Sequence, residues 1–550
     1  MLQLYSNNQQ LDISGVSFNL TRKNPLFLNT LEGDYVYDLR LPLTDNNKKY
    51  FIRFLNRLES DIAPPNPFVE IFFNGIKVFD GNYILKNIKN EIGGSIACGS
   101  GNFFSLIKDK YLDEIDYGSI SFINNPSEAF EYIDSTAWMN YPDCNFVFPY
   151  CYAFPHSYLP EGTEGYVDKD KFNIWDPVTE SYFPITPSGI RIIVPFLFLR
   201  FIIKKLFMET GYTVDDRFFA PNEDLSRLLV FNNYNANIGI PDDEENNKIG
   251  YVSTIIKLVL NRHVPHILIS DFISDLQNLF NCRFYFNQHI KRVSILNGTS
   301  ILLDTFYTDL TGKTINQFES EFNNYNGFYH EIKNDEDDMA FTYYYLENNK
   351  DFFENNFGGS VNTIQELPNP PLSFILYYVE SELKIYFYHS GSWHIAAEWL
   401  QFISKIYSGK NRLDILTNVS GLVSEPLWDK LSICGNNAYD YRKLKLKLVF
   451  WHGIRLWPLI DNHYPVASSI RNDYRIQHPS IYNKFWNKYF AFMMNTRCVN
   501  LKINLSVSDI TKLDLSKKIR VNGINYLIKE VKTPISERSI GVSTLECYRV

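Results

Sequence analysis

The chain has 550 residues, of which 45% are hydrophobic and 16% aromatic, and its formal net charge at pH 7 is −9. At roughly 150 residues per domain, this length predicts about three to five modules rather than one core. The acidic excess and the lack of a long Lys/Arg run argue against a dedicated nucleic-acid binder, whose affinity comes largely from basic side chains on phosphates.

The aromatic content admits two interpretations, which do not exclude each other. Tyr and Phe are enriched at protein interfaces, which predicts a protein that functions inside an assembly. A chain rich in Asn, Lys, Ile, Tyr and Phe is also what an AT-rich genome encodes, and then the aromatic content says nothing about partners.

The cysteines are odd in number, scattered and without a Cys-x-x-Cys pair: Cys98, Cys144, Cys151, Cys282, Cys434, Cys498 and Cys547. This pattern disfavours a disulfide framework or a zinc cage and predicts buried free thiols in a reducing compartment. The N-terminus lacks the basic start and apolar core of a signal peptide. The most apolar stretch, 192–207, contains Arg200, Lys204 and Lys205 and is shorter than the ~20 residues of a membrane span. We therefore expect a soluble protein made in the cytoplasm.

Residues 1–118 are predicted to form an N-terminal β-domain, because the pattern from 16 to about 117 is that of strands. A three-strand meander is expected over 68–73, 76–79 and 82–88, with turns at Asn74-Gly75 and Asp80-Gly81. Asn-Gly suits a tight hairpin turn because both residues accept a positive φ.

Residues 119–190 are interpreted as a loop-rich aromatic insertion, since they hold many aromatic, proline and turn residues without a sustained period. Trp138, Trp175 and the run 146–150 stand out. Such a cluster either stacks on sugar rings or forms a local core beneath a long loop. Local packing is the commoner outcome, and we favour it here.

Residues 191–300 are predicted to form helix-plus-hairpin modules. The first helix covers 190–211, with Pro195 in its first turn and Gly211 at its end, and a short strand follows at 212–214. No catalytic side chain is required of such a unit.

The second helix of this region is the clearest local signal in the chain. Ser270 suits its N-cap, and Asn281 suits its end because Asn tolerates left-handed backbone. Strands at 283–286 and 292–296 then pair around a polar turn. The order Pro, helix and strand recurs about 70 residues after its first occurrence, which suggests two copies of one unit.

Residues 301–440 are interpreted as a β-rich insertion module. Strands are expected at 340–346, 372–379 and 383–389, and the last two form a hairpin across 380–382. Aromatic residues stand on both faces, so protein is expected to cover both faces of this sheet. The acidic runs 242–247 and 335–338 lack the ligand spacing and turn glycine of a calcium loop and are interpreted as solvated turns.

Residues 441–550 are predicted to form a C-terminal β-domain with one helix. The helix covers 479–494, and an alternating strand at 444–448 runs on to 451. The closing strands are expected at 498–505, 519–521, 524–531 and 543–549, with a loop at 508–510 and a turn at Asn522-Gly523.

Several segments resemble tail and baseplate hub proteins of tailed bacteriophages, in particular Bacteroidota phages. The N-terminal segments are Asn24-Pro25-Leu26-Phe27, Leu41-Pro42-Leu43-Thr44-Asp45-Asn46 and Val69-Glu70-Ile71-Phe72-Phe73-Asn74-Gly75, followed by Phe79-Asp80-Gly81. The central segment is 264–297, and the C-terminal segment is 518–531. About half of the length lies outside any such resemblance.

The resemblance implies an α+β, β-rich multidomain fold with terminal tube-like β-barrel domains and helix-plus-hairpin central modules. In this family the first and last domains sit side by side, so that three subunits make a pseudo-sixfold ring. The implied function is that of a non-enzymatic virion protein, a tail or baseplate hub. Its partners are copies of itself in a ring, expected to be a trimer, other tail proteins, and genomic DNA that passes without specific binding.

A search for chemistry finds no catalytic, cofactor-binding or metal-binding residues to assign. His263 and His266 straddle a proline, and His394 with Glu398 lacks the zinc-protease pattern. The run 99–101 is not expected to open a helix after a buried strand, so a phosphate site is disfavoured. No pair of carboxylates stands out for glycoside hydrolysis.

The residues expected to pack between subunits are apolar positions of the terminal β-domains: Phe72, Phe79, Tyr526 and Ile528. The same positions suit ordinary core. Two alternatives stay open for the function. One is a ring or adaptor protein of a short-tailed virion, and the other is a carbohydrate-binding or cell-wall-degrading tail protein that uses the regions of Trp138, Trp175 and Trp393.

Overall fold

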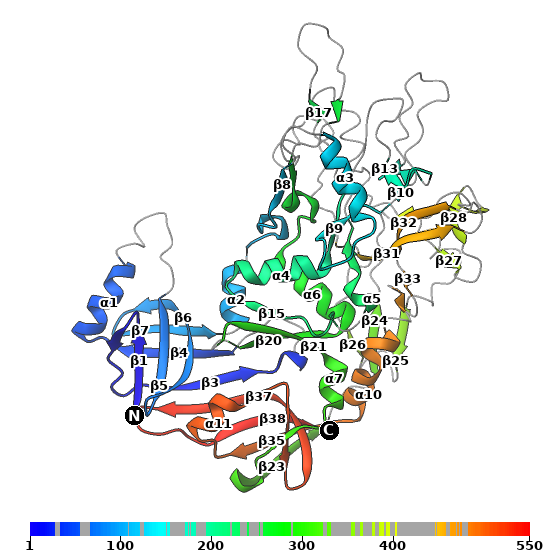
Figure 1. The fold of residues 1–550 in the computed structure, drawn as a ribbon. Helices are drawn as coiled ribbons and strands as arrows, with labels where there is room; N and C mark the ends of the chain where they lie inside the picture. The colour runs from blue at the N-terminus through cyan, green and yellow to red at the C-terminus, as the bar shows by residue number, and fades with distance from the viewer. Residues whose placement is uncertain are drawn as a thin grey trace.

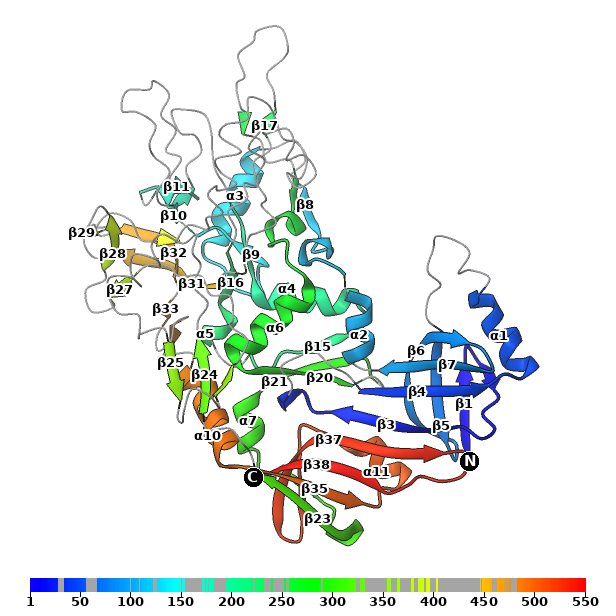
Figure 2. The same ribbon diagram turned by 180° about the vertical axis from the view of Figure 1, so that it is seen from behind.

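Figures 1 and 2 show the computed structural model of the chain. It describes residues 1–27, 34–55, 67–98, 100–107, 109–121, 126–149, 151–153, 171–173, 175–176, 178–182, 194–220, 223–231, 239–240, 252–253, 257–287, 290–322, 327–331, 354–357, 364–366, 377–379, 384–389, 392–395, 402–403, 446, 448–457, 462–468, 470–471, 474–475 and 482–550. Several sheets and some helices form the described part, which confirms the prediction of a β-rich α+β chain. Its helices include none that is long and apolar enough to span a membrane.

The largest element is a thirteen-stranded sheet built from both ends of the chain (Figure 1). Its N-terminal strands are β1 (Leu2–Ser6), β2 (Gln9–Leu11), β3 (Ser17–Lys23), β4 (Asp34–Pro42), β5 (Phe68–Phe73), β6 (Ile76–Ile88) and β7 (Glu91–Cys98). Its later strands are β22 (Tyr307–Asp309), β23 (Thr314–Phe322), β35 (Arg497–Ile503), β36 (Lys518–Val521), β37 (Ile524–Ser536) and β38 (Ser543–Arg549). The order is β2-β1-β5-β6-β7-β4-β3-β37-β38-β35-β23, with β36 and β22 added alongside β37.

The pairing of β3 with β37 joins the two ends of the chain. Seven residue pairs run antiparallel, from Ser17 opposite Ser536 to Lys23 opposite Glu530. The strands on both sides of this seam contribute to one hydrophobic core, in which Leu20 and Val36 lie with Leu545. The first and last parts of the chain therefore share both a sheet and a core.

Two helices cover the core side of this sheet, and the sequence analysis missed both. In α1 (Asp45–Leu55), Tyr50 and Phe51 are buried in the core. α11 (Val507–Lys512) replaces the loop that was predicted at 508–510. It forms because the Ser506 side chain accepts from the Asp509 backbone N–H while the Asp509 carboxylate accepts from that of Ser506, a reciprocal cap that a Ser-x-x-Asp spacing permits.

The meander in the N-terminal half is present, but one of its turns was misplaced. Asn74 and Gly75 have φ values of 51° and 77° and make the expected turn between β5 and β6. The predicted turn at Asp80-Gly81 is wrong, because β6 continues through both residues and the chain next reverses at 89–90. A Cβ on Gly81 would lie 2.1 Å from the carbonyl oxygen of Ala97, so the glycine serves close strand approach rather than a turn.

Replacing Gly81 with alanine is expected to destabilise the protein by about 3 kcal/mol or more, because backbone atoms of β7 must move away from the new methyl group. Gly312→Ala is the matched control, since nothing lies within 4 Å of a Cβ built there. Urea unfolding of the two variants measures the difference. Equal stability of both variants would contradict the close approach of β6 to β7.

A second hydrophobic core lies in the middle of the chain. A five-stranded sheet in this region has the order β32 (Asn462–Ser468), β31 (Leu448–Trp457), β16 (Leu228–Val230), β14 (Phe196–Phe198) and β9 (Phe146–Val147). A three-stranded sheet has the order β15 (Thr213–Asp215), β21 (Arg292–Asn297) and β20 (Cys282–Asn287). The helices here are α2 (Ser100–Ile107), α3 (Pro126–Thr136), α4 (Leu199–Glu209), α5 (Glu223–Ser226), α6 (Ile269–Phe280), α7 (Gly298–Leu303) and α10 (Asn487–Asn495).

The helix-plus-hairpin prediction is confirmed for α6, β20 and β21, although the start of the helix differs. α6 begins before Ser270, and Leu268 precedes it without a side-chain cap, so the predicted cap is wrong. Asn281 ends the helix in the left-handed conformation, with φ 49° and ψ 32°. β20 and β21 then pair antiparallel, and β15 joins β21 in parallel.

The first central helix is shorter than predicted. α4 begins at Leu199, and the preceding residues Phe196–Phe198 form β14, which pairs with β9 and β16. Pro195 is therefore not in the first turn of a helix. Gly211, with φ 79°, follows the helix as expected. The prediction extended the helix over Phe196–Phe198 because a strand that is buried on both faces is apolar throughout, and its sequence then resembles that of a buried helix.

Other departures from prediction concern short elements. α3 lies inside the predicted loop-rich insertion, and α2 begins directly after β7, so the expectation that no helix opens near 99–101 is wrong. The C-terminal helix comprises a π-helical turn, Tyr482–Trp486, followed by α10. β31 begins at Leu448, and residues 444–445 and 447 lie outside the described part.

The remaining strands pair in twos and threes. These are β8 (Ser119–Ser121) with β19 (Lys257–Val259); β10 (Cys151–Ala153) with β11 (Lys171–Phe172) and β30 (Phe402–Ile403); β12 (Trp175–Asp176) with β13 (Ser181–Tyr182); β17 (Gly239–Ile240) with β18 (Val252–Ser253); β24 (Gly327–Glu331) with β25 (Glu354–Phe357) and β26 (Ile364–Glu366); β27 (Tyr377–Val379) with β28 (Lys384–His389), which also pairs β29 (Ser392–Ile395); and β33 (Ile470–Arg471) with β34 (Tyr474–Arg475). The hairpin of β27 and β28 confirms the one predicted across 380–382. The strand predicted at 340–346 and the acidic runs 242–247 and 335–338 lie outside the described residues.

The two cores meet at a buried asparagine. Asn24 is fully buried, and its side-chain NH2 donates to the carbonyl oxygens of Leu515 and Ile528, each at 2.7 Å. Its side-chain oxygen accepts from the Leu26 N–H at 3.0 Å and from the Tyr285 hydroxyl at 2.7 Å. One side chain therefore ties the end of β3 to the C-terminal strands and to β20.

Asn24→Ala is expected to lower the free energy of unfolding by about 3 kcal/mol, because the carbonyl oxygens of Leu515 and Ile528 lose a buried donor and the Tyr285 hydroxyl loses its acceptor. Asn19→Ala is the control, since Asn19 lies exposed on the same strand. Chemical unfolding measures both variants. A loss for Asn24→Ala no larger than that for Asn19→Ala would contradict the role given to this side chain.

Candidate functional site

The residues considered for chemistry do not assemble into a site. His263 is buried, and His266 stacks on Tyr111 with its Nδ1 2.9 Å from a carboxylate oxygen of Asp113. His394 lies on β29 rather than on a helix, and Glu398 is outside the described residues. Across the described ranges, no group of three or more His, Cys, Asp or Glu side chains is placed to hold a metal ion.

The five cysteines whose side chains the structure describes are free thiols. Cys98, Cys144, Cys282 and Cys547 are buried as predicted, whereas Cys498 is partly exposed. Burial raises the pKa of the Cys144 and Cys282 thiols to about 12. These thiols stay protonated at neutral pH and act as core residues.

The tryptophans proposed for sugar stacking do not form a common platform. Trp138 is 56% exposed, but Trp175 is buried and its indole N–H donates to the carbonyl oxygen of His463 at 2.8 Å. Trp393 lies on β29, and its side chain is outside the description. Trp175 serves a local core, as favoured from the sequence.

Three of the four expected interface residues lie in the terminal core. Phe79, Tyr526 and Ile528 are each at most 5% exposed. Phe72 is partly exposed on the opposite face of the sheet, where its ring meets that of Tyr5 edge-on at 5.6 Å. The three buried side chains are core residues of the chain, and their role at a contact between subunits stays a prediction.

The face of the sheet opposite the terminal core carries ion pairs, some between neighbouring strands and some within one strand. Lys77 lies 3.1 Å from Glu70 and 2.8 Å from Asp80. On the C-terminal strands, Lys532 lies 3.2 Å from Glu530. Lys529 and Glu546 pair at 2.5 Å. At these positions each lysine stands beside a carboxylate.

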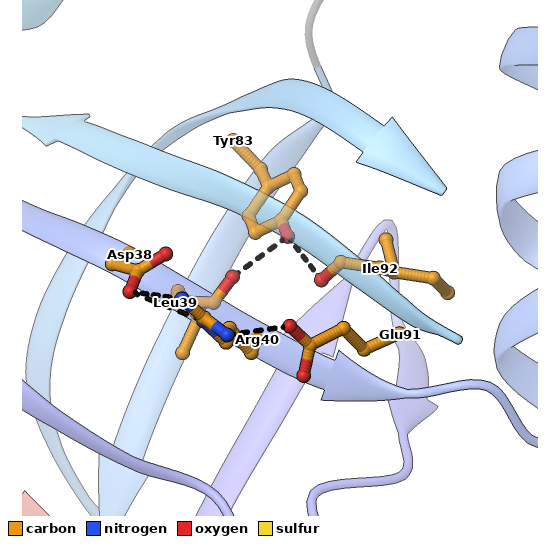
Figure 3. Close-up of polar contacts among 6 residues, drawn as sticks. All are labelled: Asp38, Leu39, Arg40, Tyr83, Glu91 and Ile92. Carbon is orange, nitrogen blue, oxygen red and sulfur yellow. Dashed lines mark hydrogen bonds and ion pairs between the residues drawn. The ribbon is translucent and has the colours of Figure 1, made fainter. Parts of the chain in front are cut away.

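A β-bulge interrupts this face on β4 (Figure 3). The register with β7 shifts between Val36 and Leu39, and Asp38 adopts a φ of 52°, which is uncommon for a residue other than glycine. Arg40 lies 2.8 Å from Asp38 and 2.8 Å from Glu91. The hydrogen bond from Arg40 lowers the pKa of Asp38, and the same bond raises the pKa of Arg40.

The bulge exposes the Tyr37 ring to solvent and packs over the buried ring of Tyr83. Tyr37 is 60% exposed, and the centre of its ring lies 4.1 Å from the centre of the Tyr35 ring. The Lys86 ammonium lies 5.6 Å from the centre of the Tyr37 ring. Beneath them, the hydroxyl of the fully buried Tyr83 lies 3.0 Å from the carbonyl oxygen of Ile92 and 3.2 Å from that of Leu39 (Figure 3). Tyr is enriched at protein interfaces.

The residues of this surface could be predicted only in part from the sequence. Alternation on β5 and β37 was visible, but which face is buried depends on which strands the sheet brings together. The bulge at Tyr37-Asp38 breaks the alternation of β4 and left no local signature. The described part of this face is polar and aromatic, with ion pairs on β5, β6, β37 and β38 and an exposed tyrosine on β4.

Tyr83→Phe is expected to cost about 1 kcal/mol of unfolding free energy, because two buried carbonyl oxygens lose a hydroxyl donor. Tyr37→Phe removes the same atom from an exposed ring and is the control, with no measurable change expected. Urea unfolding compares the two. Equal effects would show that the Tyr83 hydroxyl does not support the bulge.

Comparison with known proteins shows distant similarity to solved structures. No family model matches the chain, and no curated protein matches it. Among solved structures, the chain is similar to the 43 kDa tail protein of prophage MuSo2 from Shewanella oneidensis, with 8% identity, a TM-score of 0.32, and coverage of 99% of this chain and 95% of that one. It is also similar to a tail protein from Neisseria meningitidis MC58, with 6% identity, a TM-score of 0.28, and coverage of 100% and 95%. Both TM-scores are low, so neither likeness establishes a shared fold.

Proposed function

We propose that the chain is a non-enzymatic structural protein of a phage virion, a tail or baseplate hub that assembles with copies of itself around the tail axis. The observation that carries the proposal is the pairing of β3 with β37, which places the first and last strands in one sheet. The hub resemblance of the terminal segments implies side-by-side terminal domains. The boundaries 1–118, 119–190, 191–300, 301–440 and 441–550 belong to this proposal.

The arrangement of the C-terminal strands supports a barrel in that module. The strands β22, β36, β37, β38, β35 and β23 follow one another by pairing, and β22 and β23 are joined in sequence by the single turn Thr311–Lys313. The first and last members of the series are thus neighbours along the chain. A sheet whose two ends are linked in this way curls toward closure.

The charge of the sheet supports a passive relation to DNA. Cations of the outer face stand beside carboxylates, and the chain as a whole carries −9. Strong DNA binding requires several basic groups free to meet phosphates. A hub with this composition lets DNA pass through its ring without holding it.

The test is the symmetry of the purified protein. Mass photometry and negative-stain electron microscopy are expected to show rings with threefold symmetry. Sixfold or twelvefold rings would favour the ring or adaptor protein of a short-tailed virion. A chain that stays monomeric at micromolar concentration would contradict self-assembly, and turnover of peptidoglycan or capsule polysaccharide would contradict the non-enzymatic assignment.

A further inference from the structure

Two arginines and one aspartate gather at the edge of the three-stranded sheet. β15 lies at the edge of this sheet and runs parallel to β21, with Thr213 opposite Arg292. Figures 1 and 2 show the two strands side by side. Asp215 ends β15, Arg217 follows it by two residues, and Arg292 begins β21. The pairing of the two strands therefore brings the three charged side chains together from distant parts of the sequence.

Both arginines bond to the same oxygen atom of Asp215. The Nη2 atom of Arg217 lies 2.7 Å from Oδ2 of Asp215, and that of Arg292 lies 2.6 Å from the same oxygen. The Asp215 side chain is 6% exposed, whereas the side chains of Arg217 and Arg292 are 69% and 47% exposed. The carboxylate therefore lies beneath the two guanidinium groups and orients them, and solvent meets the cations.

The Asp215 carboxylate is ionised at neutral pH. Burial raises its pKa, but the hydrogen bond from Arg217 and the charges of both arginines outweigh burial and hold the pKa below its usual value. A guanidinium group stays protonated in proteins, so one negative charge stands against two positive charges. Two cations held at one oxygen atom repel each other, and a single carboxylate compensates only half of their charge.

No further carboxylate of the described residues completes this balance. Across the described part of the chain, Arg217 and Arg292 form ion pairs with Asp215 alone. Asp216, the next carboxylate along the chain, is bonded to Arg200 at 2.7 Å. The edge of β15 therefore keeps an excess of positive charge on a chain whose net charge is −9.

Lys291 adds a third cation next to Arg292. Its backbone is fixed beside β15, because its carbonyl oxygen accepts from the Thr213 N–H at 2.8 Å and from the Thr213 hydroxyl at 3.2 Å. The Lys291 side chain is exposed, and its ammonium lies 5.3 Å from the centre of the Tyr212 ring. It forms no ion pair with any residue that the structure describes.

The bulge on β4 shows the opposite ratio of charges. There a single arginine, Arg40, lies 2.8 Å from Asp38 and 2.8 Å from Glu91, so two carboxylates satisfy one guanidinium group. At the edge of β15 one carboxylate serves two guanidinium groups. Each of these groups has five N–H donors, and those not bonded to Asp215 have no acceptor among the described residues. Only the edge of β15 therefore has both the charge and the donors to take up an anion.

We infer that Arg217 and Arg292, oriented by Asp215, bind a phosphate group at the edge of β15. Guanidinium groups match phosphate oxygens through pairs of parallel N–H···O bonds. A phosphate supplies the negative charge that this edge lacks, and its several oxygens accept from both arginines at once. Inorganic phosphate and a phosphate ester share this chemistry.

The inference does not rest on the proposed virion role, and it leaves the passive relation to DNA in place. Strong binding to DNA requires several phosphate contacts along the duplex, and one pair of arginines provides a single contact. The site therefore suits a small phosphate or a single phosphate ester rather than a nucleic-acid backbone.

The test is a titration of the full-length protein with inorganic phosphate and with glycerol 3-phosphate, followed by 31P NMR. Inorganic phosphate is expected to bind with a dissociation constant on the order of 1 mM. Arg217→Gln and Arg292→Gln are each expected to weaken binding about tenfold, because each removes one charge-assisted contact. Either variant leaves Asp215 paired with the other arginine, and circular dichroism checks that both are folded. Arg40→Gln is the matched control and is expected to bind as the original chain does.

The remaining outcomes decide the inference and the source of the phosphate. Binding of glycerol 3-phosphate as tight as that of inorganic phosphate indicates an ester as the ligand, and its exclusion indicates the free anion. Arg292→Lys keeps the charge but loses the planar guanidinium, so an intermediate loss is expected. The inference is overturned if phosphate does not bind at millimolar concentration, or if Arg217→Gln and Arg292→Gln bind it as well as Arg40→Gln does. Tighter binding of the acidic peptide hexaglutamate than of phosphate would also overturn it and would assign this edge to an acidic protein partner.

Discussion

The structure depends on a buried seam between the two ends of the chain. β3 and β37 pair over seven residues, and at the end of this seam the Asn24 side chain satisfies four hydrogen bonds inside the protein. A buried amide is costly unless its donors and acceptors all find partners. Here the partners come from three parts of the chain, so the amide is satisfied only when all three are assembled.

The seam also explains how two cores form one body. On β37 and β38, neighbouring residues face opposite ways: Ile528 and Cys547 belong to the terminal core, whereas Leu527 and Tyr548 belong to the central core. The ring of Tyr548 lies 4.7 Å from that of Phe27, which follows Asn24 by three residues. β37 and β38 are thus buried on both faces at Leu527-Ile528 and Cys547-Tyr548, which packs the central core against the terminal sheet.

Local signals in the sequence were reliable where local chemistry decides the structure. The turns at Asn74-Gly75 and Asn522-Gly523, the end of α6 at Asn281 and the hairpin that follows it were all predictable, because each depends on backbone preference or simple alternation. Predictions from the sequence were wrong or missing where residues far away along the chain decide the local structure. The sequence around Gly81 is that of a turn, but the glycine is required because the Ala97 carbonyl lies against it. Asn24 has no distinguishing local signal, because the carbonyl oxygens that accept from its side chain lie 491 and 504 residues away along the chain. For the surface, the sequence named apolar positions but not the face on which each lies.

The most direct test of the account is disulfide trapping across the seam. Asn19 lies opposite Pro534, and directly opposed residues of an antiparallel pair are about 4.5–5.5 Å apart, a span that a disulfide bridges. The double variant Asn19→Cys with Pro534→Cys is expected to cross-link under mild oxidation, as peptide mapping detects, whereas Asn19→Cys with Lys532→Cys is two residues out of register and is expected to cross-link far less. Failure of the first pair, or equal trapping of both, would contradict a sheet shared by the first and last parts of the chain.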